Sequence, residues 1–110
     1  MKNKSILGKM ILHTEKILTY CADADYDSFS SDSLLTEACV FNLSQLGELT
    51  TKLSPDFLQQ HPDLPWMQMK GLRNKIVHDY EGVNLVLVWE IISSDLPELR
   101  EQLKSLQASL

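Results

Sequence analysis

Glycine and proline are scarce in this chain, with four of each among 110 residues, and aromatic residues make up only 7%. No stretch alternates apolar and polar residues as a half-buried strand does, so the sequence speaks against a sheet-rich fold. Apolar residues still account for 44% of the chain, and this length suffices for one core. We therefore expect residues 1–110 to form a single domain.

Cysteine is almost absent, and long apolar runs are missing. Cys21 and Cys39 lack the CxxC spacing of a metal or redox motif, so we interpret them as small, reduced apolar residues. Nothing approaches the ~20 consecutive apolar residues of a membrane span. The apolar residues near the N-terminus are interrupted too often for a signal peptide. These absences favour a cytoplasmic protein with no membrane partner.

Basic residues are outnumbered, because 10 Lys and Arg face 15 Asp and Glu, for a formal net charge of −5 at pH 7. A molecule with this balance repels polyanions as a whole. A nucleic-acid substrate would have to be met by a local basic site rather than by a basic coat.

Metal-ligand patterns are incomplete. Asp23, Asp25 and Asp27 are spaced like the start of a calcium loop, but Ser28 stands at the glycine position and Leu34 where a bidentate glutamate is needed. We therefore predict a solvated loop there. The histidines show no ligand spacing either. We expect no metal site and no cofactor.

Helical periodicity covers most of the chain. It predicts helices over residues 5–20, with Ser5 as the cap, and from about residue 32 to residue 53. The Asp- and Ser-rich residues 21–32 between them form a connection, with room for one helical turn pinned by Phe29.

Proline and glycine set the boundaries of the later helices. Ser54 and Pro55 begin a short helix that ends by residues 61–62, because a residue before proline avoids the α region. A longer helix begins at Pro65 and ends near residues 81–82, where glycine is a stop signal.

The last helix has an apolar stripe that continues to the C-terminus. Asn84 caps this helix, and Pro97 should kink it or divide it in two. Together the predicted elements form an all-α fold, an up-and-down bundle of four main helices plus a short helix.

Three polar or small residues stand on the apolar faces of the first two long helices. His13 is a lone histidine, which on a helix is more often a partly buried or surface residue than a ligand. Asn42 needs a hydrogen-bond partner if it is buried. Gly47 costs its helix up to ~1 kcal/mol relative to alanine, and permits the close approach of another helix or a ligand. Glu48, beside it, either is an exposed acid or reaches a neighbouring arginine.

Residues 73–80 concentrate the side chains with chemical potential: Arg73, Asn74, His78 and Tyr80. On a continuous helix, Asn74 and His78 share one face, as do Arg73 and Tyr80. Arg73 and His78, however, lie roughly 140° apart around the axis. They can meet one ligand only if the helix ends between them or if a second copy of the chain completes the site.

An arginine, a histidine and a tyrosine near a helix C-terminus can also be dipole partners and rim residues without any chemistry. The residues by themselves leave this structural interpretation open beside the functional one.

The pattern Arg-x4-His-x-Tyr, with Asn74 directly after the Arg, resembles the signature of the HEPN superfamily, specifically its HepT-like branch. Residues 42–48 resemble the "NLxxIGE" segment of this branch, and residues 61–66 its "HPxxPW" turn. Residues 82–89 resemble "GVDLxxVW", and residues 95–97 match a "DLP" near the end. The similarity covers nearly the whole chain in the same order.

The resemblance implies a helical homodimer whose central motifs face each other. It also implies a metal-independent endoribonuclease, the toxin of a toxin–antitoxin pair, with Arg73 and His78 as catalytic residues and an RNA substrate. Asn74 and Glu48 would support the site. Tyr80 would accept AMP from a cognate minimal nucleotidyltransferase, the antitoxin.

Two features of this chain keep an alternative open. The branch commonly has an arginine where this chain has Phe41, which removes a positive charge, and the net charge is −5. The alternative is a catalytically inactive nucleotide-binding or scaffolding subunit of a nucleotidyltransferase.

Overall fold

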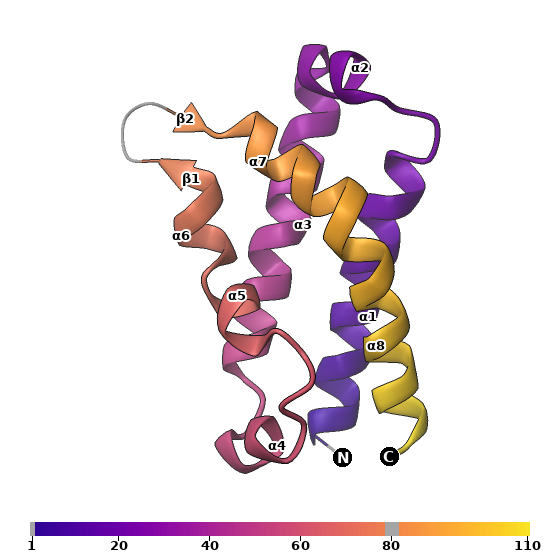
Figure 1. Cartoon of the computed structure of the whole chain (residues 1–110), viewed down its shortest axis with the longest axis vertical. Helices are drawn as coiled ribbons and strands as arrows, with labels where there is room; N and C mark the ends of the chain where they lie inside the picture. The colour runs from indigo at the N-terminus through magenta and orange to yellow at the C-terminus, as the bar shows by residue number, and fades with distance from the viewer. Residues whose placement is uncertain (1, 79–81) are drawn as a thin grey trace.

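In residues 2–78 and 82–110, the part of the chain that the computed structural model describes, four main helical segments run alternately up and down (Figure 1). The segments are α1 (Lys2–Tyr20), α3 (Ser33–Thr51), α5 (Trp66–Lys70) with α6 (Leu72–Ile76), and α7 (Leu85–Glu90) continuing into α8 (Leu96–Ala108). The start of α1 and the end of α8 lie side by side at one end of the molecule (Figure 1). The predicted all-α bundle is confirmed.

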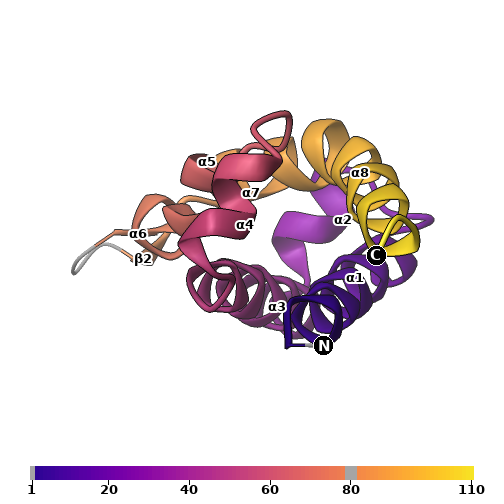
Figure 2. The ribbon, with the colours of Figure 1, turned by 90° about the horizontal axis from the view of Figure 1, so that it is seen from below.

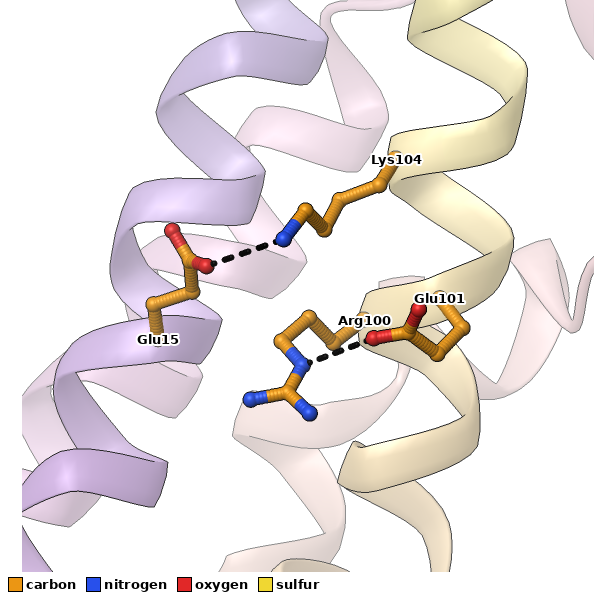
Figure 3. A network of polar contacts seen from close by, with 4 residues as sticks. All are labelled: Glu15, Arg100, Glu101 and Lys104. Atoms are coloured by element: carbon orange, nitrogen blue, oxygen red, sulfur yellow. Dashed lines mark hydrogen bonds and ion pairs between the residues drawn. The ribbon is translucent and has the colours of Figure 1, made fainter.

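The first helix packs against both its neighbours, α3 and α8 (Figure 2). Its apolar stripe is buried between them, through Ile6, Leu7, Met10, Ile11, Thr14 and Ile17. At the solvent side, Lys104 of α8 lies 3.5 Å from a carboxylate oxygen of Glu15, and Arg100 pairs with Glu101 (Figure 3). These pairs are exposed and contribute little stability.

The start of α1 differs from the prediction. The helix already includes Lys2, so Ser5 lies within it and is not its cap. The reason is a tertiary contact: Asn3 donates from Nδ2 to the Ser54 hydroxyl (3.2 Å) and accepts from the Ser54 backbone N–H (3.3 Å). These bonds hold the first turn of α1 against the segment before α4 (Pro55–Gln60).

The connection after α1 contains one short helix, α2 (Tyr26–Ser31), as predicted. Asp25 caps it by accepting from the Ser28 N–H (2.8 Å), and the Ser28 side chain accepts from the Asp25 N–H in return. This is a capping box. Phe29 is fully buried and its ring centroid lies 5.1 Å from that of Trp89.

Side-chain caps mark the starts of three further helices. Asp32 accepts from the Leu35 N–H (3.1 Å) at the start of α3, and Ser54 caps α4 (Pro55–Gln60). Asn84 caps α7 by accepting from the Leu87 N–H (3.1 Å). The predicted caps Ser54 and Asn84 are therefore confirmed.

The last helix is divided before Pro97, as predicted. A π-helical segment at Ile91–Asp95 separates α7 from α8, and the Leu96 N–H bonds to the Ile91 carbonyl, five residues back. Proline has no N–H to continue the α-helical ladder, and the wider turn accommodates its ring.

No helix in the described residues is both long and apolar enough to cross a bilayer.

Candidate functional site

The helix that carries Arg73 and Asn74 ends earlier than predicted. α6 stops at Ile76, and the backbone continues as a short antiparallel hairpin of β1 (Val77–His78) and β2 (Gly82–Val83). The expectation of a helix that runs to residues 81–82 is wrong. The Asn84 N–H bonds to the Ile76 carbonyl (3.1 Å), and Gly82 adopts φ = +90°, a conformation open to glycine.

This early end changes which side chains share a face. Asn74 and His78 cannot stack on one helical face, because the backbone of His78 is in β1 and pairs with Gly82. The sequence allowed two ways for Arg73 and His78 to meet one ligand: a helix that ends between them, or a second copy of the chain. The helix does end between them, because α6 stops at Ile76. Tyr80, expected on the same helical face as Arg73, lies outside the described residues.

The position of Arg73 follows from the apolar residues of α6. Leu72 and Ile76 are buried in the core, one helical turn apart. Arg73 and Asn74 are exposed. The helix therefore presents a fixed cation and an amide to solvent directly before the chain reverses.

Close packing against α3 holds this segment in place. A Cβ atom at Gly47 would lie 2.8 Å from the Met69 carbonyl oxygen, so the predicted close approach of another helix is confirmed. Glu48 follows Gly47 and is exposed. The ion pairs recorded among the described residues include neither Glu48 nor Arg73. A role for Glu48 in lining the site therefore stays a prediction.

Phe41 lies on the same face of α3 as Glu48, seven residues before it, and 59% of its surface is exposed. An exposed apolar ring therefore stands where the resemblance implies an arginine. Within residues 2–78 and 82–110, no three His, Cys, Asp or Glu side chains are grouped to hold a metal ion.

A family model described as "Ribonuclease HepT-like" matches residues 10–106. The chain belongs to this family. The matched segment includes α3, α5, α6 and the β1–β2 hairpin.

Three relatives of this HepT-like chain match it over nearly their whole length. "Putative RNase TTE0752" of Caldanaerobacter subterraneus is 37% identical over 91% of this chain and 89% of its own. "Putative RNase MJ1380" of Methanocaldococcus jannaschii is 28% identical, with 92% and 93% covered. "Probable ribonuclease HepT" of Thermococcus cleftensis is 28% identical, with 96% of each chain covered. No solved structure matches the chain significantly.

One group of residues in this HepT-like chain was not predicted from the sequence. Lysines of α1 and of the segment after α3 meet at one end of the bundle, although they are far apart in the sequence. The seven-residue spacing of Lys2 and Lys9 was the only signal, since it places both on one helical face.

Proposed function

We propose that this chain is the toxin of a toxin–antitoxin pair: a metal-independent endoribonuclease that uses Arg73 and His78, neutralised by AMP transfer to Tyr80 from a nucleotidyltransferase. The observation that carries the proposal is the match to the ribonuclease HepT-like family across α6 and the hairpin. There an exposed arginine is followed by a chain reversal that contains the histidine.

The chemistry assigns a proton transfer to His78 and charge stabilisation to Arg73. His78 takes the proton from an RNA 2′-hydroxyl, whose oxygen then forms a bond to the adjacent phosphorus. The bond from phosphorus to the 5′-oxygen breaks, and that oxygen takes up a proton, which leaves a 2′,3′-cyclic phosphate. The planar guanidinium of Arg73 stabilises the charge on the phosphoryl oxygens. Asn74 orients the phosphate or the imidazole, and Glu48 lines the site.

The proposal includes a homodimer, because a second copy of the chain can bring its own Arg73 and His78 to the same site. Exposed apolar residues on α3 favour such an interface: Leu34 and Phe41, seven residues apart, are 81% and 59% exposed. Light scattering at micromolar concentration should give about twice the 12.5 kDa of the single chain. A monomer mass would contradict it.

The ribonuclease is tested by removing each catalytic group. His78→Ala should lose about 10²–10⁴-fold in cleavage rate, the usual value of a positioned acid or base. Arg73→Ala should be comparably impaired, while Arg100→Ala, an exposed arginine on α8, should cleave like wild type. EDTA should not reduce the rate. Circular dichroism melts establish that every variant is folded.

A catalytically inactive nucleotide-binding or scaffolding subunit is the second candidate. The net charge of −5 and Phe41 in place of a cation favour it. Folded wild-type and His78→Ala proteins that are equally inert on RNA would exclude the ribonuclease and leave this candidate.

A further inference from the structure

A groove at the end of the molecule where both chain termini lie has a lining rich in lysine. It has a volume of about 680 Å³, and the start of α1, the end of α3 and the segment before α4 form its walls. Lys2, Lys9 and Lys52 line it, and none of the described residues that line it is acidic. The β1–β2 hairpin lies toward the opposite end of the long axis (Figure 1). Among the described residues that line the groove, none belongs to α6 or to this hairpin.

The groove is built from fixed parts. Lys2 and Lys9 are seven residues apart and lie on one face of α1. Lys52 is the C-cap residue of α3, and its backbone N–H bonds to the Leu49 carbonyl (3.0 Å). The two hydrogen bonds between Asn3 and Ser54 join the walls. Three lysines therefore line one concave surface whose walls are joined by hydrogen bonds.

The positive charge here does not serve the stability of α1. Its first turn contains no acidic residue, and Lys2 lies at the end where the helix dipole is already positive, which is unfavourable for a cation. Lys52 at the C-terminus of α3 is a favourable dipole partner, but Lys2 and Lys9 have no such role. In a chain of net charge −5, three lysines around a groove whose described lining contains no acidic residue are suited to binding an anion.

We propose that this groove binds the phosphate group of a nucleotide, either free or within an RNA strand. Three lysines supply the charge, and the hydroxyl of Ser5 lines the same groove as a further hydrogen-bond donor. The exposed ring of Pro55, which also lines the groove, offers an apolar surface for the sugar or the base. The volume is within the ~300–1,000 Å³ of small-ligand sites. The RNA source rests on the proposed ribonuclease function, whereas the free nucleotide does not.

The test compares two double variants that lose the same charge. Lys9→Ala with Lys52→Ala removes two lysines of the groove. Lys16→Ala with Lys104→Ala removes two exposed lysines outside it. The probes are AMP, by equilibrium dialysis, and a fluorescent single-stranded oligoribonucleotide with 2′-O-methyl riboses, by anisotropy. Without a free 2′-hydroxyl this strand cannot be cleaved, so binding is measured alone.

Two lost phosphate contacts should reduce the slope of log affinity against log salt by about 1.4, since each contact on a single strand contributes about 0.7. By the same relation, affinity for the oligoribonucleotide should fall on the order of 25-fold at 0.1 M salt in the groove variant. The control variant should bind like wild type.

Each outcome decides the proposal. A loss confined to the groove variant supports it: loss with the oligonucleotide alone identifies a strand, and loss with AMP as well identifies a nucleotide. Equal losses in both variants, or none in either, would overturn it. The proposal would also be overturned if polyglutamate, a polyanion without phosphate, displaced the fluorescent strand as effectively as unlabelled oligonucleotide does. Cleavage that depends on His78 would survive failure of the groove, and binding in the groove would survive failure of the ribonuclease proposal.

Discussion

The imidazole Nδ1 atom of His13 lies 2.7 Å from the side-chain Oδ1 atom of Asn42, and this contact joins α1 to α3. The Asn42 Nδ2 atom donates to the Ala38 carbonyl (2.7 Å), so Oδ1 accepts from the protonated Nδ1 of His13. Asn42 is buried, and His13 meets its expected need for a partner.

Replacing Asn42 with leucine keeps the volume and removes the acceptor. We expect Asn42→Leu to lower the free energy of unfolding by about 1–3 kcal/mol, because the His13 N–H loses its partner. In a double-mutant cycle with His13→Leu, measured by urea unfolding, the two changes should couple by about 0.5–3 kcal/mol. Additive effects would mean that the contact carries no stability.

Gly47 is the point where α3 meets α5, the helix directly before the one that carries Arg73. In Gly47→Ala the new Cβ would lie 2.8 Å from the Met69 carbonyl oxygen, so α5 must shift. We expect a loss of about 1–3 kcal/mol from overpacking, which outweighs the ~1 kcal/mol gain in helix propensity. Thermal melts measure the stability, and the RNA assay shows whether the displaced α6 still supports cleavage.

Gly8→Ala is the matched control for this prediction. A Cβ there would lie 3.0 Å from Nε2 of Gln107, the far end of a flexible side chain that can move. We expect this variant to be stabilised by up to ~1 kcal/mol through helix propensity. If both substitutions stabilise the protein, the close contact between α3 and α5 is not rigid.

The thiols of Cys21 and Cys39 are both buried and free, with their sulfur atoms 3.5 Å apart. Both lie in the apolar core, as expected, and that they stay reduced remains a prediction. Burial raises the pKa of both thiols, and the neighbouring Cys21 raises the pKa of Cys39 further. Both therefore stay protonated in the folded protein at a pH where unfolded thiols ionise.

This predicts a loss of stability at alkaline pH. A thiol whose pKa is raised in the folded state contributes its full stability below the unfolded thiol pKa of about 8.5. This contribution is lost as the pH rises above that value. The unfolding free energy should fall by up to about 1.4 kcal/mol per pH unit for each thiol. Urea unfolding between about pH 8 and pH 10 measures this slope, and Cys39→Ala should make it shallower. An unchanged slope would exclude the thiols as its cause.

Tyr80→Phe keeps the aromatic ring and deletes only the hydroxyl that would accept AMP. We expect the variant to retain most of the cleavage and to escape AMP transfer when the nucleotidyltransferase is present. Mass spectrometry of both proteins after incubation with the transferase and ATP measures the modification. A Tyr80→Phe chain that is modified as fully as wild type would place the acceptor elsewhere.

Local sequence determined most of the helices and their caps. Ser54 and Asn84 accept hydrogen bonds from backbone N–H groups three residues later, so a short window of sequence contains the whole signal. The short helix α2 was predictable for a similar reason, because Phe29 is the apolar residue that holds its turn in the core. The need of Asn42 for a partner was also visible, although the identity of that partner was not.

Tertiary contacts decided where the other elements end and how the candidate site is arranged. α1 begins before Ser5 because Asn3 bonds to Ser54, 51 residues away. α6 ends at Ile76, where the hairpin returns the chain and the Asn84 N–H reaches the Ile76 carbonyl. Helical periodicity does not predict such an end, because a residue's helix preference is weaker than the backbone hydrogen bonds that the hairpin makes instead. Because α6 ends at Ile76, His78 does not share a helical face with Asn74.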